Sequence, residues 1–189
     1  MNLKLLLDTT KDLVLQPAAA TEKMSAMERS NATTLTSITL PYLIAIAVAD
    51  YMGNVVFGKF AFSESVDCLM QVIVPQLILI VSYTILQTAL LGTILRYNKI
   101  QSSAKQLFNI VLYTLIPILA TATLGGLLPK ISGMINLFAL YAYYIMWLLL
   151  KNSYNDNDQM QKIRLTIIIS GALLYMTIRE LLKILFQPI

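Results

Sequence analysis

The residue best suited to chemistry is Asp50, which lies in an otherwise uncharged stretch long enough to cross a membrane, one helical turn before Asn54. An ionisable side chain at membrane depth is costly, so it marks a functional site by default. Asp50 and Asn54 could hold a proton or a cation, or make a polar contact to another span. Two structural alternatives remain: a carboxylate hydrated near the outer interface, and a neutral carboxyl group hydrogen-bonded to a neighbouring helix. The expected polar partners are the glutamines of the next apolar stretch, Gln71, Gln76 and Gln87.

Prolines interrupt the apolar stretches at Pro41, Pro75 and Pro117. Proline removes a backbone N–H group and kinks a helix, and lipid forces the freed carbonyl groups to find partners inside the protein. Broken helices build substrate sites in some transporters. In other membrane proteins such kinks only shape the bundle, and both interpretations apply to these prolines.

The residues needed for enzymatic chemistry are missing from the sequence. It contains no histidine and a single cysteine, Cys68, so imidazole-centred catalysis, thiol-rich metal sites and intramolecular disulfides are excluded. An aspartyl mechanism needs two carboxylates that share a site, and Asp50 has no second intramembrane aspartate. No P-loop, HExxH or GxSxG motif is present. We therefore expect no enzyme, no cofactor and no metal site.

The elements that must position these residues are transmembrane helices. Hydrophobic residues make up 57% of the chain and charged residues only 13%, with a mean hydropathy of +0.69, whereas soluble domains carry about 25% charged residues. A helix needs roughly 20 residues to cross the bilayer core. The sequence thus predicts an all-α, polytopic transmembrane helical bundle of about five spans. The expected spans are residues 35–58, 68–95, 107–128, 131–150 and 163–186.

The distribution of Lys and Arg predicts the orientation of the bundle. Ten of these residues lie in the N-terminal tail and in the connections after the second and fourth spans, and four lie on the opposite side. The positive-inside rule then places the N-terminus in the cytoplasm and the C-terminus outside. The net charge of +4 is explained by these connections, so we expect no nucleic-acid partner.

Residues 1–34 are expected to form a cytoplasmic segment that contains an amphipathic helix, because Leu3, Leu6, Leu7, Leu13 and Val14 recur at helical spacing. Such a helix lies on the membrane surface, or alternatively docks on the cytoplasmic face of the bundle. The charges that interrupt this segment argue against a cleavable signal peptide.

Small residues predict close helix packing in the first span. Ala45, Ala49 and Gly53 recur every four residues along one face. In lipid, small residues at this spacing let the backbones of two helices approach each other.

Tyr113 and Pro117 form a Y-x-x-x-P pattern midway through the expected third span. It stands among three characteristic stretches: LPYLIAIAVADYMGNVVFG (40–58) with Pro17 and Glu28 ahead of it, LFNIVLYTLIPILATATLGGLLP (107–129) and ISGMINLFALYAYYIMWLLLKN (131–152). In these stretches the sequence resembles the family of Ypt-interacting proteins, the Yip family, and in particular its compact prokaryotic branch.

The resemblance implies a five-span bundle with a cytoplasmic N-terminus in the plasma (inner) membrane of a prokaryote. Eukaryotic relatives bind Rab-type GTPases, but residues 1–34 lack the aspartate–leucine–tyrosine–glycine–proline type motif found there, so this partner is not carried over. The leading hypothesis is a non-enzymatic scaffold in the lipid bilayer, with a protein partner or a second copy of itself. The alternative is a small oligomeric permease or a proton- or cation-coupled carrier that uses Asp50.

Overall fold

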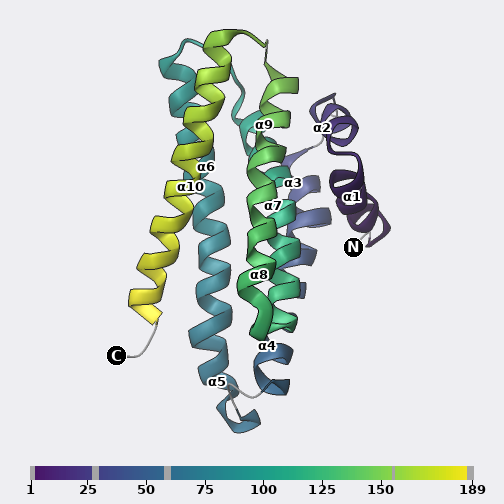
Figure 1. The fold of residues 1–189 in the computed structure, drawn as a ribbon, viewed down its shortest axis with the longest axis vertical. Helices are drawn as coiled ribbons and strands as arrows, with labels where there is room; N and C mark the ends of the chain where they lie inside the picture. Colours follow the sequence, from purple (N-terminus) through teal and green to yellow (C-terminus); the bar gives the residue numbers. More distant parts are fainter. Residues whose placement is uncertain (1–2, 27–29, 58–60, 155, 187–189) are drawn as a thin grey trace.

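The computed structural model describes residues 3–26, 30–57, 61–154 and 156–186, and the regular structure in these ranges is entirely helical (Figure 1). This confirms the expected all-α class. The α-helices are α1 (Leu3–Leu15), α2 (Pro17–Ala26), α3 (Asn31–Thr34), α4 (Leu40–Val56), α5 (Ser65–Cys68), α6 (Val74–Tyr97), α7 (Ala104–Leu127), α8 (Ser132–Leu137), α9 (Tyr141–Ser153) and α10 (Asp158–Phe186). Two π-helical turns, Leu35–Thr39 and Leu69–Ile73, precede α4 and α6, and short 3-10 turns cover Phe62–Glu64, Pro129–Ile131 and Phe138–Leu140.

Five helical stretches are long and apolar enough to cross a membrane, which confirms the predicted number of spans. They are Ala32–Val56, Ser65–Tyr97, Ala104–Leu127, Pro129–Ser153 and Asp158–Phe186. Most of them extend beyond the uncharged runs of the sequence. Polar and charged side chains near a helix end can reach the headgroup region, so a helix need not stop where its apolar run stops.

The two ends of the bundle differ in charge. We call them the α2 end, where the α6–α7 and α9–α10 connections also lie, and the α5 end, which α5 occupies (Figure 1). The basic residues at or near the α2 end include Arg96, Lys99, Lys105, Lys151 and Lys162, whereas Lys130, Arg179 and Lys183 lie toward the α5 end. A cytoplasmic α2 end is the orientation that the positive-inside rule predicts.

The central helix of the bundle is α7. Its residues 111–119 are all buried, because α4, α6, α8 and α9 all pack against it. The buried Thr114 donates its hydroxyl hydrogen to the Ile110 carbonyl oxygen at 2.8 Å, so this polar group is satisfied within the helix. By contrast, α10 packs mainly along α6. Only 11% of its 18-residue apolar stretch is buried inside the protein, compared with 67% of the corresponding stretch of α7.

The prolines of the first two spans each follow a widened turn. The Leu40 N–H donates to the Leu35 carbonyl oxygen, and the Val74 N–H donates to the Leu69 carbonyl oxygen, which are π-type bonds between residues five apart. Pro41 and Pro75 come directly after these bonds. The extra residue in each turn coincides with the site where proline removes a donor. Pro117 is buried within α7, which remains one continuous helix.

The N-terminal helices α1 and α2 lie along the flank of the bundle (Figure 1). Leu6 and Leu13 of α1 are buried, and the Thr10 and Tyr42 hydroxyl oxygens are 2.7 Å apart. Tyr141 of α9 donates to the Leu13 carbonyl oxygen at 3.1 Å. These contacts attach α1 to both the first and the fourth span.

Candidate functional site

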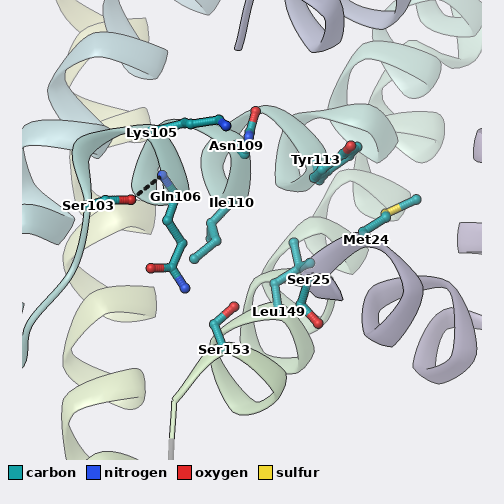
Figure 2. Close-up of a pocket in the computed structure, with 10 residues that line it drawn as sticks. All are labelled: Met24, Ser25, Ser103, Lys105, Gln106, Asn109, Ile110, Tyr113, Leu149 and Ser153. Carbon is teal, nitrogen blue, oxygen red and sulfur yellow. Dashed lines mark hydrogen bonds between the residues drawn. The ribbon is translucent and has the colours of Figure 1, made fainter. Parts of the chain in front are cut away.

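A polar pocket opens at the α2 end between α2, α7 and α9. Its volume is about 340 Å³, which falls at the lower end of the range of small-ligand sites. Figure 2 shows residues of α2 and α9 facing the first turns of α7 across the pocket. The lining consists of Met24, Ser25, Ser103, Lys105, Gln106, Asn109, Ile110, Tyr113, Leu149 and Ser153.

Tyr113 is the lining residue of α7 that lies farthest from the start of the helix (Figure 2). Its side chain is only 2% exposed, yet its hydroxyl makes no hydrogen bond to any residue that the structure describes. Pro117, four residues later, has no N–H to donate to the Tyr113 carbonyl oxygen, which a regular helix would require. The Y-x-x-x-P pattern therefore removes the regular helical hydrogen bond to the Tyr113 carbonyl oxygen, in the same residue whose hydroxyl lacks a described partner.

The mouth of the pocket favours a negatively charged group. Lys105 is exposed there, and the first turn of α7 directs backbone N–H groups toward the same end, where the helix dipole is positive. Ser103 caps this helix by accepting a hydrogen bond from the Gln106 N–H at 3.1 Å. Among the described residues, the lining offers hydroxyl and amide groups but no carboxylate or thiol. This donor set suits a polar or acidic ligand better than a metal ion.

Asp50 lies where α4 crosses α7, and it is only 8% exposed. A Cβ atom added at Gly126 of α7 would overlap its Oδ1 atom and would lie 2.9 Å from its backbone nitrogen. Asn54 donates from Nδ2 to the backbone carbonyl oxygen of Asp50 at 2.7 Å, so it does not pair with the carboxyl group. Oδ2 of Asp50 has no hydrogen-bond partner within the described ranges. The crossing therefore encloses a carboxyl group that forms no salt bridge with any residue in the described ranges.

We expect Asp50→Asn to leave the stability of the protein unchanged or slightly higher. The amide keeps the shape of the side chain and removes the cost of an uncompensated carboxylate. The measurement is thermal unfolding in mild detergent. Unfolding is monitored with a fluorogenic maleimide, which reacts with the fully buried Cys68 when the bundle opens. Asp12→Asn, the same change on the exposed side of α1, is the control. A fall of more than about 5 °C, or roughly 1–2 kcal/mol, would show that the carboxylate has a stabilising partner.

The structure does not pair the intramembrane glutamines with Asp50 among the residues that it describes. Gln87 is fully buried, its amide lies against Gly171 of α10, and its Nε2 atom is 3.8 Å from the Met146 sulfur. Gln71 and Gln76 line a separate groove beside α10. Among described contacts, none of the three hydrogen-bonds to Asp50. Of the predicted polar residues, only Asn54 hydrogen-bonds to Asp50 within the described ranges.

Arg164 is a buried charge that the sequence patterns did not reveal. Its side chain is 1% exposed, it donates from Nη2 to the Asp156 carboxylate, and its guanidinium carbon lies 4.6 Å from the centre of the Trp147 ring. Lys151 adds a longer contact to the same carboxylate at 3.8 Å. These contacts join α9 to α10 at the α2 end. The sequence signal was weak, because a basic residue beside a polar connection normally lies in water.

The connection that contains Asp156 also contains a partly buried phenol, that of Tyr154. Burial raises the pKa of Tyr154 to about 12, so this side chain stays neutral at physiological pH. It therefore adds no negative charge beside the pocket, and Lys105 sets the charge of the pocket's mouth.

Comparison with known proteins gives one result that covers most of the chain. The family model described as the Yip1 domain matches residues 11–178, a range that includes Asp50, Tyr113 and Pro117. No curated protein and no solved structure matches the chain. The matched range covers the first four spans completely and most of the fifth. Given this match and the five membrane-spanning helices, the chain belongs to the Yip1 domain family of membrane proteins.

Proposed function

We propose that the protein is a non-enzymatic membrane scaffold that recruits a protein partner through the pocket at the α2 end. The observation that carries this proposal is the open polar pocket with the unpartnered Tyr113 hydroxyl in its wall. The proposal includes a cytoplasmic α2 end, which rests on the positive-inside rule. It also includes a location in the prokaryotic plasma (inner) membrane, which rests on the sequence resemblance.

The chemistry of the pocket defines the partner that would fit. An Asp or Glu side chain would meet Lys105 and the positive end of the α7 dipole at the mouth. A polar atom that reaches further in would meet the Tyr113 hydroxyl, which lacks a partner in the described part of the chain. The volume of about 340 Å³ admits one or two side chains. The expected ligand is therefore a short acidic segment of another protein.

The test is photo-crosslinking from inside the pocket in native membranes. A photoreactive residue at Ser153, which lines the pocket, should give a discrete adduct, whereas the same residue at the exposed Gln159 should not. Lys105→Glu should reduce the adduct roughly tenfold, because it replaces an attraction with a repulsion at the mouth. Lys162→Glu makes the same charge change on an exposed face of α10 and should leave the adduct unchanged.

Two outcomes would reject the scaffold. Equal adduct yields in the Lys105→Glu and Lys162→Glu variants would show that the pocket does not select the partner. If the wild type carries protons across liposome membranes and Asp50→Asn abolishes this flux, the protein is instead a carrier. Because Asp50 is outside the pocket lining, the two experiments probe separate parts of the molecule.

A further inference from the structure

A second, larger cavity lies on the other side of the bundle, toward the α5 end. It is a groove of about 640 Å³ between α6, α7, α10 and the segment that contains α8. Along α10 the lining runs from Ala172 to Phe186, a length of about 21 Å at the helical rise per residue. This exceeds half of the roughly 30 Å bilayer core, which is the depth of one leaflet. Most of the wall is apolar, including Leu79, Ile118, Leu137, Leu140 and Met176.

The register between α6 and α10 shows where the polar residues of the groove lie. The helices are antiparallel, since Gln87 faces Gly171 and the Tyr83 and Tyr175 rings are 5.5 Å apart. Extending this register by two turns brings Gln76 level with Lys183, whereas Gln71 lies near the last turn of α10. The charged and amide groups therefore gather toward the end of α10, and in the interior only the hydroxyl groups of Thr121, Tyr143 and Tyr175 interrupt the apolar lining.

These polar groups are incompletely satisfied by the protein. Neither Gln71 nor Gln76 makes a side-chain hydrogen bond in the part of the chain that the structure describes, and Arg179 forms no salt bridge there. Lys183 pairs with Glu180 at 2.6 Å, but Glu180 does not line the groove. The mouth thus carries an unpaired cation and two free amides. At the headgroup level such groups can bind the polar part of a lipid.

We propose that this groove binds one anionic phospholipid from the leaflet at the α5 end. The phosphate lies against Arg179 and Lys183, the amides of Gln71 and Gln76 donate to the ester oxygens, and one acyl chain fills the apolar part. Charge complementarity selects an anionic headgroup. The acyl chain fills a space that would otherwise leave the lining residues without contacts. This site lies apart from the α2-end pocket, so it extends beyond the proposed scaffold function.

The test compares lipids retained by the purified protein. The full chain is extracted from nanodiscs that contain equal amounts of phosphatidylglycerol and phosphatidylcholine, and the bound lipids are counted by native mass spectrometry. About one phosphatidylglycerol per chain is expected, with little phosphatidylcholine. Arg179→Gln combined with Lys183→Gln should lower this enrichment roughly tenfold or more. Lys130→Gln, also toward the α5 end but outside the groove, is the control.

A second variant tests the apolar part independently. Met176→Trp places a larger side chain on the groove wall, at a position that is 62% exposed. It should reduce retention of phosphatidylglycerol several-fold while the charges remain. The proposal is overturned if the wild type retains both lipids in their bulk ratio, or if the double Gln variant keeps its phosphatidylglycerol. Displacement of the lipid by inorganic phosphate alone would point to a free anion site and would likewise overturn it.

Discussion

Gly53→Ala should lower the apparent unfolding temperature by about 10 °C or more, equivalent to roughly 3 kcal/mol. A Cβ atom at this position would overlap the carbonyl oxygen of Gly126 and lie 2.9 Å from its carbonyl carbon. The obstruction is the backbone of α7, so no side chain can rotate away. The crossing must open, and in lipid this contact is a main source of helix association. The fluorogenic reaction of Cys68 measures the shift.

Gly133→Ala is the matched control for this prediction. It adds the same methyl group within a helical segment, but no described atom beyond its chain neighbours and its own helix backbone lies within 4 Å of the added Cβ. Its unfolding temperature should equal or slightly exceed that of the wild type, since alanine favours helix over glycine. Equal shifts in the two variants would contradict the proposed importance of the α4–α7 crossing.

Asp156→Asn should be the most damaging substitution in the α9–α10 connection. Arg164 would then keep its guanidinium at 1% exposure without the carboxylate that it contacts. Breaking a buried pair commonly costs 3–5 kcal/mol. Since the Asp156 side chain is 38% exposed, we expect a smaller loss of about 2 kcal/mol, or roughly 6 °C.

Removing the buried charge should reverse this loss. Arg164→Met in the Asp156→Asn background keeps an apolar stem against Trp147 and leaves no unpaired guanidinium. The double variant should therefore unfold at a higher temperature than Asp156→Asn alone, in the same Cys68 assay. If it unfolds at a lower temperature, Asp156 acts through something other than its pairing with Arg164.

The architecture follows from the sequence because lipid imposes a simple rule on it. Every span must be a helix of about 20 apolar residues, so the number of spans can be counted from the uncharged runs. The small residues of the first span also permit the expected close helix packing, since Ala49 and Gly53 lie closely against α7. The partner of these residues was not predictable. Gly126 becomes visible only when the two helices are brought together.

The candidate site was less accessible to sequence reasoning. Tyr113 was singled out through the family pattern, but its place in a pocket depends on α2 and α9, which come from distant parts of the chain. The glutamines were expected near Asp50, whereas Gln71, in the π-helical turn before α6, and Gln76 of α6 line the groove beside α10. Side-chain packing decides which face of a span contacts which neighbouring helix. The hydropathy of the sequence does not predict this.

The central place of α7 has a consequence for how the bundle is assembled during synthesis. This span leaves the ribosome third, yet it is the one that lipid touches least, and α9, one of the helices that cover it, is made later. Until α9 arrives, a row of residues destined for the interior faces lipid or the insertion machinery. The final span docks mainly on α6, with further contacts to α9. Ribosome-bound chains that end before α9 should therefore be degraded by quality-control proteases more readily than chains that include it.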